Sequence, residues 1–448
     1  MTSENPIAPN SQWFHGGSMD SLPKNVTVLL ALMWLALSPL TQVHADDADA
    51  WVIDAWDFPA DKAPPLRARI GNLSPDVTSS EADAVRYVHQ GVNLMMGYWD
   101  VEAYRSFLQA SRVDPNCAMA YWGMALTMIG SEAELQPKMD AAANRAFELA
   151  GMIDGVNGTP ISEVEKAYII GLARYLKDGP EQFAQTMKEI SKKNSDSRLA
   201  RLMHALFLRD GYNAEGKENL GQTKALALIE EYLTRYPDDV HGLSIKTQML
   251  VLGPDFKNAD DAARKLAMLK PGTAYMLHLP GLVQYRLGNF KEASEAFQAA
   301  RQFDEDYLKT TEIHPTEMPF YIKNLEALVF ALAEGGRRKD AVEVAKIVGS
   351  IEVLPSDFMG SGVKELIYHG VALETLVHIR YLDWKSAFAS APDEKKMVGN
   401  RPLPSRVYYE ALRRYTAARV ALQEKLIPEA RRELLALEAL GGGAIARI

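Results

Sequence analysis

The chain has a single cysteine, Cys117, among its 448 residues. One thiol cannot form an internal disulfide, and it excludes a Cys-x-x-Cys zinc or redox motif. The excess of one charge sign is also small, since 58 acidic and 49 basic residues leave a net charge of −9. A nucleic-acid surface needs a clustered basic face, so we expect no nucleic-acid partner. Because no Gly-x-Ser-x-Gly, P-loop, His-Glu-x-x-His or Gly-x-Gly-x-x-Gly motif occurs, we also expect no cofactor and no catalytic role.

Long apolar runs are missing everywhere except near the amino terminus. There, Lys24 precedes an apolar run over residues 26–37, and the small residue Ala45 follows it. This pattern predicts a signal peptide over residues 1–45, with Met19 as a possible true start. We therefore expect an exported protein, periplasmic or secreted. The alternative is an uncleaved signal, which would be its only contact with a membrane.

Runs of alternating β-branched residues are absent too. Residues 46–80 are rich in Pro, Asp and Ser and show no period, which predicts an extended lead-in. Helix-forming residues dominate from there to the end, and Ser80-x-x-Asp83 and Ser162-x-x-Glu165 have the spacing of capping boxes. The sequence predicts an all-α fold.

One helix-turn-helix template recurs along the chain, at residues 84–117, 274–307 and 322–355. Small residues at its eighth and twentieth places let two antiparallel helices approach closely, and a Gly between them supplies the turn. Residues 118–151 and 411–444 are predicted to be further copies, the last one degenerate. We expect a helical repeat array over residues 81–448. The small residues are Gly91, Gly281 and Val329 at the eighth place, and Ala103, Ala293 and Ala341 at the twentieth.

The stretches "LGNFKEASEAFQAA" and "DVEAYRSFLQASRVDP" resemble the tetratricopeptide repeat (TPR). The resemblance implies a right-handed α-superhelix whose concave groove binds a protein or peptide partner. We expect an interaction or scaffold module, unless later parts of the chain fill the groove. A closed cavity would instead indicate a small-molecule or peptide carrier. The candidate groove residues are Trp122, Tyr275, His278, Tyr285, Lys323, Glu326 and Phe330.

Residues 84–350, with "DPNCAMAYWGMAL" and "LHLPGLVQYRLGNFKEA", are similar to a group of exported bacterial TPR proteins of poorly defined function. That group carries histidine-rich stretches. This chain keeps His241 and His278 but has Tyr275, Lys323 and Glu326 where the group has histidines. The alternative function is a metal-dependent or hydrolytic enzyme with a groove site around His241 and His278, and the departures count against it.

"DPNCAMAYWGMAL" is predicted to join two repeats. Cys117 has no neighbouring histidine or basic residue in the sequence to lower its pKa, so we expect an unreactive thiol. Tyr121 is predicted to pack in the seam between the repeats, and Trp122 to face the groove.

Overall fold

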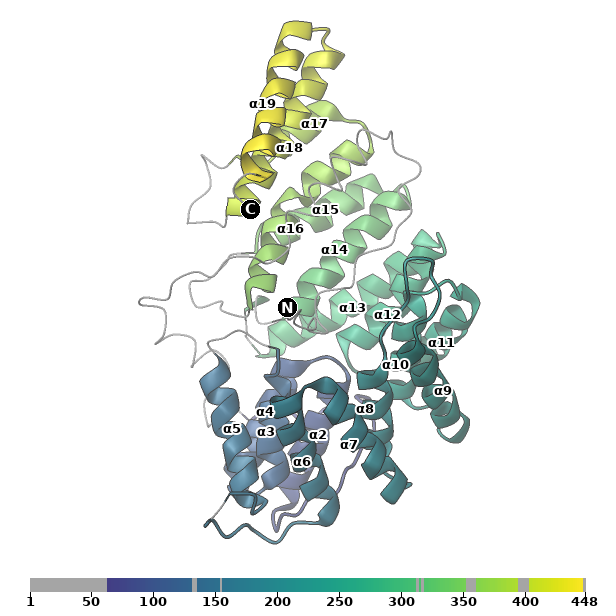
Figure 1. Ribbon diagram of the computed structural model, residues 1–448. Helices are drawn as coiled ribbons and strands as arrows, with labels where there is room; N and C mark the ends of the chain where they lie inside the picture. Colours follow the sequence, from purple (N-terminus) through teal and green to yellow (C-terminus); the bar gives the residue numbers. More distant parts are fainter. Residues whose placement is uncertain are drawn as a thin grey trace. The chain divides into compact units, whose positions relative to one another are not determined.

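The computed structural model describes residues 63–130, 135–153, 155–311, 314–315, 318–351, 360–393 and 403–445. The predicted signal peptide and residues 46–62 of the lead-in lie outside these residues. The described residues form helices joined by turns, with one isolated bridge between Tyr212 and Glu218 and no strand (Figure 1). The all-α prediction is confirmed. None of the described helices is both long and apolar enough to cross a bilayer.

The chain divides into two units between Thr310 and Thr311, where the sequence predicted one array. We call them the N-terminal and C-terminal units. The first helices of the N-terminal unit are α2 (Ala82–Met96), α3 (Asp100–Val113), α4 (Ala118–Thr127), α5 (Gln136–Leu149), α6 (Glu163–Asp178) and α7 (Pro180–Lys193). They are followed by α8 (Arg198–Leu208), α9 (Leu220–Arg235), α10 (Val240–Val251), α11 (Phe256–Met268), α12 (Ala274–Arg286) and α13 (Phe290–Thr311). The C-terminal unit holds α14 (Pro319–Glu334), α15 (Arg338–Gly349), α16 (Gly360–Arg380), α17 (Trp384–Ser390), α18 (Leu403–Gln423) and α19 (Ile427–Ile445).

The helices follow one another as antiparallel pairs, and successive pairs stack within each unit. In the N-terminal unit the first helices α2, α4 and α6 touch in sequence, as do α8, α10 and α12. In the C-terminal unit α14, α16 and α18 do the same, and the second helix of a pair also contacts the first helix of the next, as α15 contacts α16. Stacking of successive helix pairs is the packing of a solenoid. More distant pairs also touch in the N-terminal unit, as Asn93 of α2 and His241 of α10 do.

Glycines let the paired helices approach one another. A Cβ atom at Gly91 of α2 would lie 2.7 Å from the ring of Phe107 on α3, and one at Gly123 of α4 would lie 2.3 Å from the same ring. Gly281 of α12 stands in the same relation to Phe297 of α13, at 2.6 Å. An aromatic ring therefore fills the space that a missing side chain leaves, which is the small-to-large packing that the repeat template predicts.

Only one of the two predicted capping boxes forms. Ser162 accepts a hydrogen bond from the Glu165 backbone N–H at 3.1 Å, and the Glu165 carboxylate accepts from the Ser162 N–H at 2.8 Å, so the box that starts α6 is confirmed. The box predicted at Ser80 is wrong. Helix α2 is preceded by Glu81, which makes no side-chain cap, because Ser79 takes the Glu81 N–H instead.

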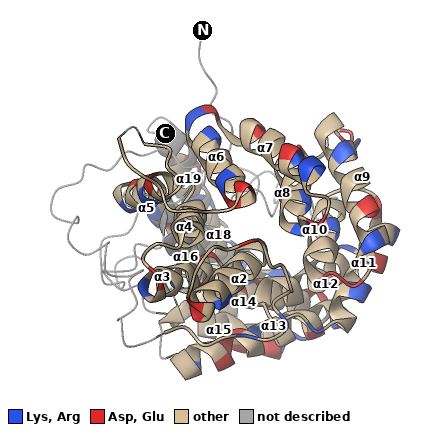
Figure 2. Ribbon diagram, turned by 90° about the horizontal axis from the view of Figure 1, so that it is seen from below, with Lys and Arg blue, Asp and Glu red and all other residues tan. Residues whose placement is uncertain are grey.

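Both signs of charge occur along the helices of the N-terminal unit. Figure 2 shows Lys and Arg interleaved with Asp and Glu on α7, α9 and α11. Ion pairs join neighbouring helices, as between Arg174 and Glu189 at 3.3 Å and between Lys246 and Glu230 at 2.6 Å. Such pairs neutralise one another locally, so none of these three helices presents a surface of one sign.

Candidate functional site

An extended segment, residues 65–79, lies against the helices of the N-terminal unit. We call it the N-terminal segment. Its side chains Ile70 and Leu73 are 4% and 1% exposed, although no described helix includes them. At Gly71 the backbone has φ of +121°, and a Cβ there would lie 2.1 Å from Nε2 of His241. Only glycine fits at this point, because both the conformation and the space exclude a side chain.

Asn93 of α2 holds the main chain of the segment at Leu73. Its Oδ1 accepts from the Leu73 N–H at 2.9 Å, and its Nδ2 donates to the Leu73 carbonyl at 2.8 Å. The same Oδ1 lies 2.9 Å from Nε2 of His241 on α10. Since an amide oxygen only accepts, His241 donates from Nε2. Burial lowers the pKa of His241 to about 4, so the ring is neutral near pH 7 and serves as a fixed donor.

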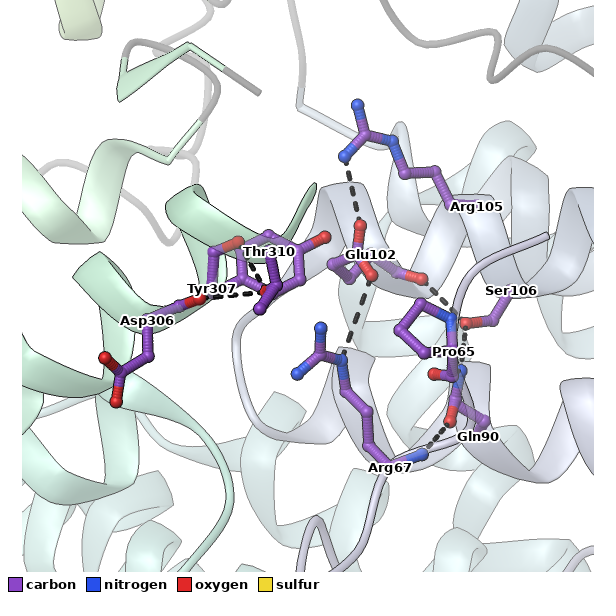
Figure 3. A network of polar contacts seen from close by, with 9 residues as sticks. All are labelled: Pro65, Arg67, Gln90, Glu102, Arg105, Ser106, Asp306, Tyr307 and Thr310. Carbon is purple, nitrogen blue, oxygen red and sulfur yellow. Dashed lines mark hydrogen bonds and ion pairs between the residues drawn. The ribbon is translucent and has the colours of Figure 1, made fainter. Parts of the chain in front are cut away.

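Gln90, one helical turn before Asn93, holds the segment at a second point (Figure 3). Its Oε1 accepts from the Arg67 N–H at 2.8 Å, and its Nε2 donates to the Pro65 carbonyl at 3.1 Å. The same Nε2 lies 3.1 Å from the hydroxyl of Ser106 on α3. Two amides three residues apart share one helix face, so α2 presents them as a pair of clamps on the segment backbone.

The side chain of Arg67 enters a slot lined by two aromatic rings and a carboxylate. Its guanidinium lies 4.8 Å from the ring centre of Trp99 and 4.3 Å from that of Tyr307. Glu102 is 4.0 Å from Arg67 and pairs with Arg105 at 3.0 Å, as Figure 3 shows. Two aromatic rings and a carboxylate form a site for a cation.

Further contacts continue along the rest of the segment. Arg198 at the start of α8 donates to the Asn72 side chain at 2.8 Å and also pairs with Asp239. The carboxylate of Glu165 accepts from the Thr78 N–H at 2.6 Å, besides capping α6. The Gly272 N–H, just before α12, donates to the Arg69 carbonyl at 2.8 Å. The segment thus contacts α2, α6, α8 and α10 and the residue Gly272 before α12. It lies beside a depression of about 400 Å³ shared with α2.

The predicted groove residue Trp122 belongs to the interior. It is 0% exposed, and its indole N–H donates to the Tyr168 carbonyl of α6 at 3.1 Å. Tyr121, expected in the seam, is instead half-buried, with its hydroxyl donating to the Pro115 carbonyl at 3.3 Å. The expectation that Trp122 faces the groove is therefore wrong, because its indole fills the contact between α4 and α6.

Tyr275 and His278 of α12 are also buried, each 4% exposed. Tyr275 lies 4.5 Å from the ring of Tyr98, and the His278 ring lies 4.7 Å from that of Phe297. The expectation that they face a partner is wrong. The chain itself covers both positions, which is the alternative that the sequence left open.

The remaining predicted residues are covered to different degrees. Glu326 is 8% exposed and lies 2.5 Å from Nδ1 of His369, in the C-terminal unit. Tyr285, Lys323 and Phe330 are half-buried. Lys323 lies 5.2 Å from the ring of Phe320, and burial lowers its pKa. Glu326 is therefore engaged within its own unit and is not an open recognition residue.

The residues of the predicted enzyme site have separate structural partners. His241 contacts Asn93, whereas His278 packs on Phe297. Within the described part of the chain, no group of three His, Cys, Asp or Glu side chains is arranged to hold a metal ion. Cys117 is buried, and burial raises the pKa of its thiol to about 11. A thiol with that pKa is protonated at pH 7 and is a poor nucleophile.

No known protein family matches the chain, and no curated protein is similar to it in sequence. Among solved structures, it is similar to a tetratricopeptide repeat protein from Parabacteroides merdae, with 11% identity over 75% of this chain and 99% of that one, at a TM-score of 0.32. Yeast Tom70 matches with 13% identity over 81% and 79%, at 0.34. The TPR domain of P58(IPK) matches with 15% identity over 82% and 97%, at 0.20. These TM-scores are low. The description of the fold as stacked helix pairs therefore rests on the contacts between the helices of this chain.

The clamp residues Gln90 and Asn93 were missed in the sequence, as were Arg67 of the segment and Arg198. The available signal was two amides, three residues apart, within the predicted helix over residues 84–96. Amides on an apolar face need hydrogen-bond partners when they are buried. The partners lie 20 or more residues away in the sequence, in a stretch without periodicity.

Proposed function

We propose that this protein is an exported scaffold that binds an extended peptide from a protein partner. The peptide would bind where the N-terminal segment now lies, on a surface that we call the track. One observation carries the proposal: Gln90 and Asn93 pair with both N–H and C=O groups of an extended main chain. Main-chain pairing supplies affinity for any extended peptide, and side-chain pockets supply the choice among peptides. The array therefore has the groups needed to accept a peptide from another chain.

Two pockets define the sequence that the track prefers. The slot formed by Trp99, Tyr307 and Glu102 accepts a cation, which Arg67 supplies. Six residues later, Leu73 occupies a site that excludes water. We propose a partner segment with a basic residue followed six positions later by an apolar one.

A peptide titration tests this proposal. In Leu73→Asp a charge replaces the buried anchor of the segment, so the chain's own segment leaves the track while Gln90 and Asn93 remain. We expect a labelled peptide of residues 63–80 to bind Leu73→Asp saturably in fluorescence anisotropy and not the wild-type chain. Leu66→Asp is the matched control, because Leu66 lies on the same segment but is 42% exposed, and it should behave as the wild type.

The receptor side is tested in the same assay. Adding Asn93→Ala to Leu73→Asp removes two main-chain hydrogen bonds and should abolish most of the peptide binding. A Leu73→Asp protein with unchanged helical circular dichroism that binds no peptide would contradict the proposal.

Export is the second part of the proposal, and the charged and apolar pattern of residues 24–45 supports it. A carboxy-terminally tagged full-length chain should fractionate outside the cytoplasm in a bacterial host, with a mature amino terminus at Asp46. A chain that stays in the cytoplasm with its leader intact would contradict export and leave the peptide-binding proposal standing.

A further inference from the structure

The last helix of the C-terminal unit, α19, has an exposed apolar stripe. Ile427, Leu434 and Leu435 are 56%, 49% and 60% exposed. Their spacing of seven and eight residues places them on one helix face, opposite the side that packs on α18. Leu422 at the end of α18 and Leu426 in the turn before α19 are also exposed, at 48% and 44%.

An apolar stripe at this position needs a cover. The stripe is exposed to solvent, whereas a repeat face that no other repeat covers is usually polar, which keeps the array soluble. Here that face is apolar and contains a depression of about 580 Å³ lined by Ile427, Pro428, Arg431, Arg432 and Leu435. Contiguous exposed apolar surface of this kind marks an interaction site.

We infer that the α19 stripe docks against the same stripe of a second copy of this chain, with the two helices antiparallel. A two-fold axis between residues 434 and 435 makes Leu434 of one copy face Leu435 of the other. The same axis sets Arg431 opposite Glu438, and Ile427 opposite Gly442. Opposite charges then meet twice, and the large Ile427 meets a residue without a side chain. A two-fold interface requires such self-complementarity.

The pairing of Arg431 with Glu438 is available only between copies. Along one helix the two residues are seven positions apart, a rise of about 10 Å, too far for an ion pair. Both are exposed. The stripe therefore carries one positive and one negative group at matched distances from its centre.

The charges on the stripe favour a protein partner over a lipid surface. An amphipathic helix that binds membranes carries mainly Lys and Arg beside its apolar face. Here Glu438 lies on the stripe itself, and Glu429 and Glu433 are on the same helix. A single helix pair buries less than the roughly 1,200 Å² typical of stable complexes, so we expect reversible, concentration-dependent dimers.

Sedimentation equilibrium of the full-length chain, across a range of concentrations, tests the inference. We expect the wild type to exchange between monomer and dimer, and Leu435→Glu to weaken dimerisation by tenfold or more. Met268→Glu is the matched control: Met268 is 81% exposed, but on α11 of the other unit, and its change should leave the equilibrium as it is.

Charge reversal gives the sharper test. Arg431→Glu and Glu438→Arg should each disrupt the homodimer, because like charges then meet twice across the axis. An equimolar mixture of the two variants should form a heterodimer, since each Glu then faces an Arg. A wild type that stays monomeric at every concentration, or a mixture no more dimeric than its components, would overturn the inference. So would binding of a monomeric wild type to phosphatidylglycerol vesicles that Leu435→Glu abolishes, because the stripe would then serve a membrane.

Discussion

Replacement of Asn93 by alanine should release the N-terminal segment without unfolding the array. The substitution removes two hydrogen bonds to the main chain of Leu73, at 2.9 and 2.8 Å, in a place where Leu73 is 1% exposed. It also removes the acceptor of the buried His241 Nε2. A buried bond contributes about 1 kcal/mol net, and an orphaned buried group costs about 1–3 kcal/mol. We take about 2–4 kcal/mol for the pair, which raises the opening equilibrium of the segment by about 30-fold to 700-fold.

Hydrogen exchange monitored by mass spectrometry measures this opening directly. Amides of residues 66–79 should exchange faster by that factor in Asn93→Ala, while amides of the C-terminal unit keep their wild-type rates. Asn258→Ala is the control, because Asn258 is an exposed asparagine on α11 that bonds only to Asp255. If the segment keeps its protection in Asn93→Ala, the clamp contributes nothing and the reasoning is wrong. Acceleration shared equally by all helices would also refute it, since the segment would then open only with the whole unit.

Three further substitutions test the packing and the buried histidine. Gly123→Ala sets a Cβ 2.3 Å from Phe107. The free energy of unfolding in urea should therefore fall by about 1–3 kcal/mol, although alanine gains up to about 1 kcal/mol in helix propensity. Equal or greater stability would contradict the close approach. Trp122→Phe leaves the Tyr168 carbonyl without its donor and should cost about 2–4 kcal/mol in the same assay, with peptide binding by the Leu73→Asp background unchanged. Burial lowers the pKa of His241 from 6.5 to about 4. Its neutral form therefore contributes stability that is present above pH 6.5 and is lost as the pH falls toward 4, by up to about 3 kcal/mol. His241→Gln should flatten that pH dependence, and an unchanged slope would contradict it.

The helices and their pairing were accessible from the sequence because they rest on local patterns. Gly91, Gly281 and their ring partners recur at fixed spacing, and they form the close contacts between α2 and α3 and between α12 and α13. The pairs α6/α7, α8/α9, α10/α11 and α16/α17 were not among the five predicted repeats. In α6 the small residue Gly171 contacts Met187, so a flexible side chain replaces the ring of the template there. The division between Thr310 and Thr311 falls at the carboxy-terminal end of α13, just before a stretch that holds Pro315 and Pro319.

The candidate site was much less accessible. Its receptor groups come from helices far apart in the sequence, and its occupant is a stretch without periodicity. Trp122 and His278 stood out because aromatic and histidine side chains are common at binding sites, yet such residues also fill cores when neighbouring helices cover them. Burial depends on how successive pairs stack, and no single repeat specifies that.

Photocrosslinking tests the central claim, that the array recognises an extended peptide at the clamps of α2. A peptide of residues 63–80 that carries benzoylphenylalanine in place of Leu73 is irradiated with the Leu73→Asp chain, and the linked residues are identified by mass spectrometry. We expect the crosslinks in residues 86–97, around Gln90 and Asn93, and we expect excess unmodified peptide to suppress them. Crosslinks scattered over the surface, or concentrated on helices that do not contact the N-terminal segment, would contradict it.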